Sequence, residues 1–208
     1  MSKILYIPAS PRADHSNSRA VAEAFLEAYK AANPDDEIDT LDVFQEDLPP
    51  FDGDTLNAKY SIMQGQEHTA EQKEAWSTVE EIIERFKSAD KYLLAVPMWN
   101  FGIPYRLKQY LDIIIQPGYT FAVGEDGYSG LLEGKKATVV YARGGAYSEG
   151  EAANYDFQKR YLDLAFGFIG ITDVESIVVE PMMAGGPEAA EEAKTAALEK
   201  ATEAGKDF

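Results

Sequence analysis

Serine and asparagine side chains are concentrated in one short segment near the start of the chain. Ser10, Ser16, Asn17 and Ser18 stand within the segment SPRADHSNS, directly before a run with helical spacing, and Arg12 lies among them. Hydroxyl groups and the free N–H groups of a helix N-terminus bind anions, and the helix dipole adds to this preference. A plain helix-capping loop would also contain serine. The number of polar side chains in this one loop favours a phosphate site.

A second segment combines large apolar side chains with one asparagine between two prolines. Met98, Trp99, Asn100 and Phe101 lie within the segment PMWNFGIP, which follows an apolar run. Loops are normally rich in small turn-forming residues, so this one either fills the core or forms the wall of a ligand site. The second interpretation is favoured, because an apolar wall with rigid backbone amides suits a flat ring that has a polar edge.

A third segment, YARGGAY, contains Ala142, Arg143, Gly144 and Gly145 at the end of another apolar run. Adjacent glycines let a backbone approach a planar ligand closely, although a simple turn would explain them when they are taken alone. The sequence contains neither the dinucleotide motif GxGxxG nor the P-loop motif GxxxxGK[ST], which disfavours a pyrophosphate ligand. The three segments together predict a site for a monophosphate attached to a flat heteroaromatic ring, namely flavin mononucleotide (FMN).

The rest of the chain alternates between strand and helix patterns. Short apolar runs predict strands, and apolar residues at helical spacing predict the helices that follow them. The strands are expected at 3–9, 37–44, 91–96, 136–142 and 174–179, and the helices at 18–32, 71–87, 103–115, 154–168 and 187–204. Residues 45–66 are expected to form an irregular excursion and residues 116–134 a small hairpin or flap.

This alternation predicts an α/β fold, a doubly wound five-stranded parallel sheet with helices on both faces. We expect residues 1–208 to form a single domain, since no repeat or change in composition divides the sequence. Ligands of such sheets bind beyond the carboxyl ends of the strands, at the point where the strand order reverses. The three segments follow the first, third and fourth predicted strands, so they are expected to meet at that edge.

Composition disfavours several other classes of function. The sequence has no cysteine, which excludes thiol catalysis and cysteine-bound metals, and only two histidines, which argues against a histidine metal site. The formal net charge of −17 disfavours nucleic acid or an anionic membrane as a partner. Neither a signal-peptide pattern nor an apolar stretch of about 18 residues is present, so we expect a cytoplasmic protein.

In these motifs the chain resembles the FMN-dependent NADH-azoreductase/quinone reductase family, which has a flavodoxin-like fold. The resemblance is carried, in order, by KILYIPAS, SPRADHSNS, PMWNFGIP, YARGGAY and GFIGITDV, and it extends to the closing helix. It implies that the FMN phosphate binds at Ser10, Ser16, Asn17 and Ser18, the isoalloxazine ring at Met98, Trp99, Asn100 and Phe101, and its pyrimidine edge at Ala142, Arg143, Gly144 and Gly145. The sequence departs from the family at Ala142, where serine is common, and at Trp99, where tyrosine is common. These departures concern one side-chain hydrogen bond to the flavin and the width of the substrate pocket.

The same resemblance implies an activity and an assembly. NADH or NADPH would reduce FMN and then be replaced by a quinone or an azo compound, in a ping-pong cycle. A homodimer with one FMN per subunit and active sites at the interface is also implied. The cofactor carries the hydride chemistry, so no catalytic side chain is assigned, and N–H donors at the pyrimidine edge would stabilise the reduced ring. Because FMN and NAD(P)H are anions, Arg12 and Arg19 are expected to offset the negative charge at the phosphate loop.

Two other functions remain open on the sequence. The negative charge would suit a flavodoxin-like electron carrier that docks on basic partners and does not oxidise NADH. A binding protein that keeps the fold and has lost the flavin is the third possibility. Two details are open as well. Arg143 could place its charge near the reduced ring or form a structural ion pair, and Phe121, Tyr128 and Tyr147 are candidates for an aromatic lid.

Overall fold

A five-stranded parallel sheet forms the centre of the protein in the computed structural model, which describes residues 1–63, 66–67 and 69–208. The strands are β1 (Lys3–Pro8), β2 (Glu37–Thr40), β3 (Lys91–Pro97), β6 (Lys136–Ala142) and β7 (Asp173–Val179). Their order in the sheet is β2–β1–β3–β6–β7, so the strand order reverses between β1 and β3. The expected doubly wound α/β fold is confirmed.

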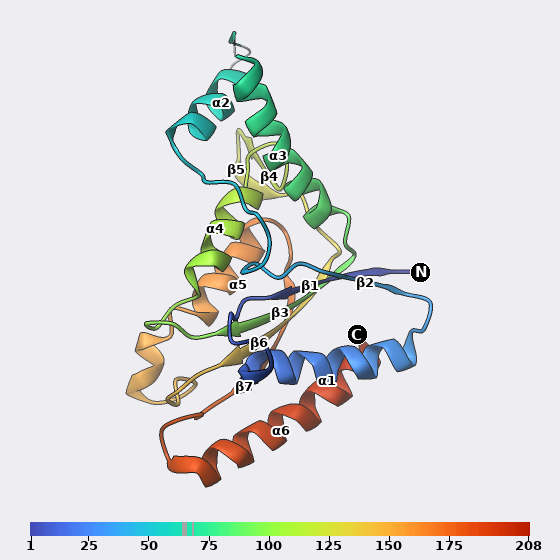
Figure 1. Ribbon diagram of the computed structural model, residues 1–208, viewed down its shortest axis with the longest axis vertical. Helices are drawn as coiled ribbons and strands as arrows, with labels where there is room; N and C mark the ends of the chain where they lie inside the picture. The colour runs from blue at the N-terminus through green and yellow to red at the C-terminus, as the bar shows by residue number, and fades with distance from the viewer. Residues whose placement is uncertain (64–65, 68) are drawn as a thin grey trace.

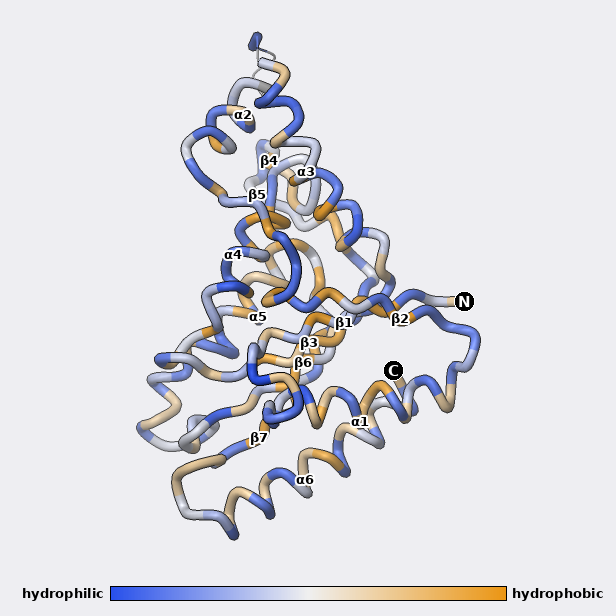
Figure 2. Tube along the Cα trace, viewed as in Figure 1, coloured by the Kyte–Doolittle hydropathy of each residue, from blue (hydrophilic) through white to orange (hydrophobic). Residues whose placement is uncertain are grey.

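Helices cover both faces of this sheet (Figure 1). On one face α1 (Asn17–Ala32) and α6 (Gly186–Asp207) lie side by side, and on the other α3 (Ala70–Lys87), α4 (Tyr105–Ile114) and α5 (Lys159–Phe168) pack. Alternate residues of a strand point to opposite faces. In β3, Leu93 and Ala95 belong to the core beneath α1 and α6, whereas Tyr92, Leu94 and Val96 belong to the opposite core. Figure 2 shows hydrophobic residues gathered along these strands.

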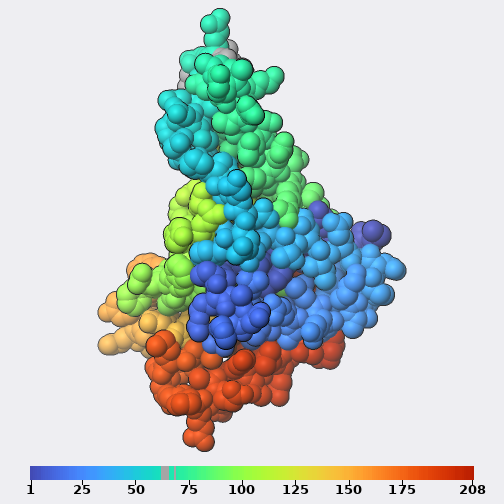
Figure 3. All heavy atoms as spheres, in the orientation of Figure 1, coloured from blue at the N-terminus to red at the C-terminus, as the bar shows by residue number. Residues whose placement is uncertain are grey.

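The connection between β2 and β3 extends away from the sheet. There α2 (Gly53–Met63) packs against α3, and the two helices form the narrow end of the molecule in Figures 1 and 3. A separate antiparallel hairpin, β4 (Phe121–Gly124) with β5 (Gly127–Gly130), contacts α5. This hairpin falls within the segment where one is expected.

Most predicted elements lie within three residues of their expected bounds, and three differ. Residues 45–66, expected to be irregular, contain α2. The second strand ends at Thr40 rather than at residue 44. The helix expected at 154–168 is divided into a 3₁₀ turn (Glu151–Tyr155) and α5. Asp156 makes this division, because its Oδ1 accepts the N–H groups of Gln158 and Lys159 at 3.1 and 2.9 Å and so starts a new helix.

The contact between α1 and α6 is unusually close. At Gly205 of α6 a Cβ atom would meet the carbonyl oxygen of Phe25 in α1, so the side chain of any other residue would push the helices apart. Phe208 follows α6, and its ring lies 5.1 Å from that of Phe25. The contact therefore covers part of the apolar side of α1, and the rest of that side packs against β3 and β6 of the sheet. In the described ranges no helix combines the length and the apolar character that a membrane crossing needs.

Candidate functional site

A cavity of about 210 Å³ lies at the carboxyl edge of the sheet, beside the reversal of strand order. Nine of the predicted binding residues line it, namely Ser10, Ser16, Asn17, Ser18, Met98, Trp99, Ala142, Arg143 and Gly144. Asn100 and Phe101 line an adjacent cavity of about 280 Å³, which shares Met98, Gly144 and Met183 with the first. Gly145 lines neither cavity and lies against the ring of Tyr147. The topology thus brings the three predicted segments together.

The end of the first cavity next to α1 provides donors for an anion. Ser10, Ser16 and Ser18 are buried, and the hydroxyl groups of Ser16 and Ser18 lie 3.1 Å apart. Ser16 is the N-cap of α1, so the N–H groups of Asn17 and Ser18 belong to the first turn and have no acceptor inside the helix. The first turn contains no acidic residue, which leaves the positive end of the helix dipole available. This arrangement suits a phosphate group.

The two arginines expected to offset negative charge here differ in their contacts. Arg12 is exposed and lines the cavity. The Nη1 of Arg19 instead donates to Oδ2 of Asp42 at 2.8 Å and to the carbonyl oxygen of Ser10 at 3.2 Å. The expectation for Arg19 is wrong in this respect, because a carboxylate already neutralises its charge. Arg19 instead links the backbone of the loop at Ser10 to the side chain of Asp42.

The segment after β3 is a tight turn with a strained backbone. The N–H groups of Trp99 and Gly102 each donate to the carbonyl oxygen of the other residue, at 3.0 and 2.9 Å. Between them, Asn100 and Phe101 have φ angles of 48° and 69°, as in a type I′ turn. Asparagine enters this left-handed region readily, whereas it costs a residue such as phenylalanine about 1–2 kcal/mol. Strain of this kind is typical of functional sites, and here it places Phe101 along the second cavity.

Buried charges hold the loop after β6. Arg143 is 2 % exposed, and it donates to Asp156 at 2.7 Å, to Gln158 at 3.0 Å and to Glu180 at 3.2 Å. A buried cation is tolerated where carboxylates surround it in this way. Of the two sequence-based interpretations of Arg143, the structural ion pair is therefore the one that the structure shows.

Two residues that line the site come from outside the three predicted segments. Met182 and Met183 follow β7, and the N–H of Met183 donates to the carbonyl oxygen of Gly144 at 2.9 Å. Met183 is 82 % exposed, and its Sδ lies 3.3 Å from the place where a Cβ of Gly144 would stand. Their position directly after the fifth predicted strand, at the same edge of the sheet, was the signal that could have identified them.

The three aromatic candidates for a lid lie in two places. Tyr147 lines the second cavity, with its ring 6.2 Å from that of Phe101. Phe121 and Tyr128 pack 6.0 Å from each other and at 4.7 and 5.5 Å from Phe168. Within this chain, Tyr147 is thus the candidate that stands beside the predicted ring site.

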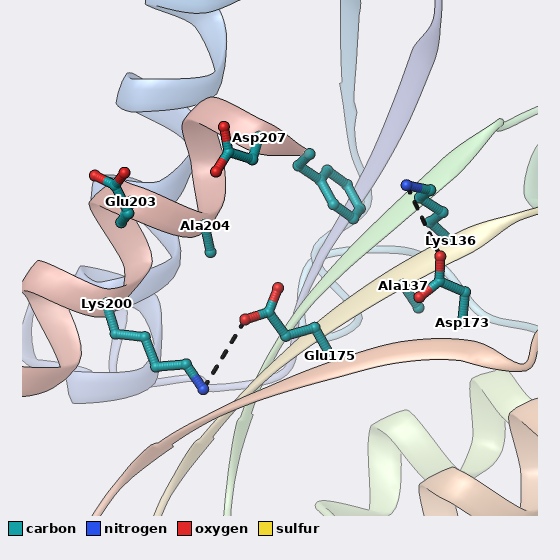
Figure 4. Close-up of a pocket in the computed structure, with 9 residues that line it drawn as sticks. Lys136, Ala137, Asp173, Glu175, Lys200, Glu203, Ala204 and Asp207 are labelled. Atoms are coloured by element: carbon teal, nitrogen blue, oxygen red, sulfur yellow. Dashed lines mark ion pairs between the residues drawn. The ribbon is translucent and has the colours of Figure 1, made fainter.

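A further cavity, of about 340 Å³, lies between β6, β7 and α6 at the opposite, amino edge of the sheet (Figure 4). Two ion pairs lie in it, Lys136 with Asp173 at 3.8 Å and Lys200 with Glu175 at 3.9 Å. Two further carboxylates come from α6. Although this cavity is larger, its excess of negative charge makes it unsuitable for a phosphate-bearing ligand.

Comparisons with known proteins find relatives along the whole chain. A family model described as flavodoxin-like fold matches residues 2–204. A Nitratidesulfovibrio vulgaris protein named FMN-dependent NADH:quinone oxidoreductase is 52 % identical over 209 residues, which cover 100 % of both chains. The crystal structure of an azoreductase from Bacillus anthracis superposes with a TM-score of 0.93 and 36 % identity over 100 % of both chains. An FMN-dependent NADH-azoreductase from the same species, solved in complex with FMN, gives a TM-score of 0.88 and 32 % identity over 98 % of this chain and 99 % of that one.

Proposed function

The chain belongs to the family of proteins with a flavodoxin-like fold, and from this premise we propose that it is an FMN-dependent oxidoreductase that uses NADH to reduce quinones and to cleave aromatic azo compounds reductively. The observation that carries the proposal is the cavity at the carboxyl edge of the sheet, where buried hydroxyl groups at a helix N-terminus face an apolar wall and a glycine loop. The names of the full-length relatives support it, and they favour NADH over NADPH as the electron donor.

The residues present fit FMN. The hydroxyl groups of Ser10, Ser16 and Ser18 and the first N–H groups of α1 would hold the phosphate. The turn at residues 98–101 would form the wall for the ring, and residues 142–144 would meet its pyrimidine edge. Because Ala142 has no side-chain donor, backbone N–H groups must supply the hydrogen bonds at this edge.

The protein would bind and orient the cofactor and the substrates. FMN, when bound, would supply the redox chemistry, which is hydride acceptance from NADH and electron transfer to the acceptor. Fixed N–H groups in the glycine loop favour negative charge at the ring edge. The aromatic side chains of Phe101 and Tyr147 in the second cavity suit planar substrates. Nicotinamide and acceptor are both planar and need the same place beside the ring, so we infer that NADH leaves before the acceptor binds, in a ping-pong order.

An apolar groove beside the second cavity supports a homodimer. Phe157 and Leu164 are 57 % and 71 % exposed, and together with Ile103 and Tyr161 they line a groove of about 440 Å³. The N–H of Phe157 donates to the carbonyl oxygen of Phe101 at 3.1 Å, so the groove adjoins the site. Exposed apolar patches of this kind mark interaction surfaces. We infer that two chains meet here with their active sites at the interface, and sedimentation equilibrium of the wild-type protein tests this.

The whole chain contributes to the site. We propose that residues 1–208 act as one FMN-binding domain. The two hydrophobic cores lie on the two faces of the same sheet, and the residues that line the site are spread along the chain between Ser10 and Met183. We also propose a cytoplasmic location, because the cytoplasm holds the NADH pool that the enzyme would use.

The visible spectrum of the purified protein with added FMN, followed by an assay of NADH oxidation with a small quinone and of azo-dye bleaching, tests the function. We expect a yellow protein that retains FMN through gel filtration and oxidises NADH faster when an acceptor is present. A yellow protein that is inert to NADH would leave the electron carrier as the better explanation. A colourless protein that binds no FMN would rule out both flavin functions and favour a binding protein without flavin.

A further inference from the structure

The carboxylate of Glu180 accepts hydrogen bonds from several residues of the loop that follows β6. Glu180 is the first residue after β7, and its side chain is 9 % exposed. Its Oε2 accepts the backbone N–H of Tyr147 at 2.9 Å and Nη1 of Arg143 at 3.2 Å. Its Oε1 accepts the N–H of Ser148 at 2.8 Å. All three donors belong to residues 143–148, so one side chain closes this segment into a loop.

These contacts require a carboxylate at position 180. Each oxygen faces at least one N–H donor, so a glutamine amide in either orientation would place its own NH₂ group against a donor. Burial alone would raise the pKa of Glu180, but the donors at Ser148 and Tyr147 and the charge of Arg143 outweigh burial and hold that pKa below its ordinary value. The side chain is therefore ionised at neutral pH, and its donors fix the path of the loop.

The loop that Glu180 closes forms part of the wall of both cavities. Gly144 lines the two cavities, and Tyr147 lines the second. The ring of Tyr147 lies 3.2 Å from the place where a Cβ of Gly145 would stand. A change in the path of residues 144–147 would therefore move the glycine backbone and the aromatic wall together.

A second anchor holds the surrounding fold independently of Glu180. Arg143 also donates to Asp156 at 2.7 Å and to Gln158 at 3.0 Å, at the start of α5. If Glu180 is replaced by a neutral side chain, Arg143 keeps one carboxylate partner, and no buried charge is left unpaired. We therefore expect the effect of such a replacement to be confined to the loop.

We propose that Glu180 is a positioning residue, which holds residues 143–148 in the shape that receives the edge of the flavin ring and sets Tyr147 beside it. The inference rests on the proposed function, because it assigns Glu180 to the FMN site. The carboxylate acts before FMN arrives. A loop that is closed for only part of the time lowers the apparent affinity in proportion to the closed fraction.

Glu180→Gln tests this proposal, with Glu175→Gln as the matched control. The control makes the same change on β7, where the carboxylate pairs with Lys200 in the cavity at the amino edge of the sheet. In a fluorescence titration we expect Glu180→Gln to bind FMN about tenfold more weakly than the wild type, because a buried donor faces a donor. We expect Glu175→Gln to bind FMN normally.

Two readouts separate positioning from a merely structural role. At saturating FMN the kcat for NADH oxidation of Glu180→Gln should recover, while the FMN concentration that gives half-maximal activity stays raised, because bound FMN closes the loop. A purely structural role would lower the melting temperature of the apo protein and leave the FMN affinity, measured well below that temperature, unchanged. An unchanged FMN affinity in Glu180→Gln would overturn the proposal.

Amide hydrogen exchange of the wild-type apo protein provides a measurement that needs no variant, and it decides the question if Glu180→Gln does not fold. The N–H groups of Tyr147 and Ser148 should exchange more slowly than the N–H groups of a surface loop usually do, because both donate to Glu180. Fast exchange at both would overturn the proposal. Failure of the proposed function looks different, since the wild-type protein would then bind no FMN, and the inference about Glu180 would fall with it.

Discussion

Phe101 allows backbone strain to be measured separately from ligand binding. Its φ of 69° costs a residue with a Cβ about 1–2 kcal/mol and costs glycine almost nothing. Phe101→Gly would also create Asn-Gly, the pair favoured in type I′ turns. Glycine loses an additional backbone entropy of about 0.5–1 kcal/mol on folding. Phe101→Ala removes the same ring and keeps the strain, so we expect the glycine variant to be more stable than the alanine variant by about 0.5–1 kcal/mol.

Thermal unfolding of the two apo variants measures this difference. In a chain of this length about 1 kcal/mol corresponds to about 2–4 °C in Tm, so Phe101→Gly should melt about 2 °C above Phe101→Ala. Titration of the same samples with FMN should show weaker binding by a similar factor in both variants, because both lose the ring that lines the second cavity.

The difference in melting temperature and the change in FMN affinity are independent results. An alanine variant that melts at or above the temperature of the glycine variant would show that residue 101 is not strained. Variants that both bind FMN and oxidise NADH like the wild type would show that the turn after β3 does not form the wall of the ring site.

Four further predictions concern the phosphate loop, the ring edge, the helix contact and pH. Ser18→Ala removes a buried hydroxyl at the N-terminus of α1, and we expect FMN affinity to fall about tenfold, as a fluorescence titration would show. Asn100→Asp places a carboxylate at the ring edge, where its negative charge disfavours the reduced ring. The midpoint potential of bound FMN should therefore become more negative in a dye-coupled titration. An unchanged potential would mean that Asn100 is not at the ring. Gly205→Ala forces a Cβ against the backbone of α1 and should cost about 1–3 kcal/mol in thermal unfolding, whereas Gly167→Ala, which has open space in α5, should not destabilise. The pKa of Glu180 lies below its ordinary value of 4.5, so the Glu180 carboxylate stabilises the fold fully above pH 4.5 and loses this effect as the pH falls through its lowered pKa. The melting temperatures of the wild type and Glu180→Gln should therefore converge between pH 7 and pH 3.

The strands β3 and β6 were predictable because burial on both faces selects a nearly continuous run of apolar residues. Residues 91–96 and 136–142 are almost entirely apolar, as is typical of strands in a parallel sheet that is covered on both faces. α2 was missed because prolines and glycines surround it and its apolar spacing is weak. The local signal that starts it is Asp52, whose Oδ1 accepts the N–H of Thr55 at 3.1 Å.

The position of the site followed from topology, whereas its internal geometry did not. The carboxyl ends of parallel strands meet at one edge of the sheet, so the three segments that follow such strands are predicted to lie together. The direction of the Arg143 side chain depends on Asp156 and Glu180, which lie in other segments of the chain. The sequence around Arg143 does not predict which carboxylates will pair with it. The positive φ of Phe101 could not be anticipated either, because phenylalanine rarely adopts it.

The close contact of α1 with α6 has a consequence for the order in which the protein is made. α1 leaves the ribosome before α6, the helix that packs against it, and α6 follows only after all five strands of the parallel sheet. Until then Val21 and Phe25 have no α6 to pack against. Contacts between such distant segments slow folding, so in a nascent chain the part of α1 that contacts α6 stays uncovered until α6 has been made.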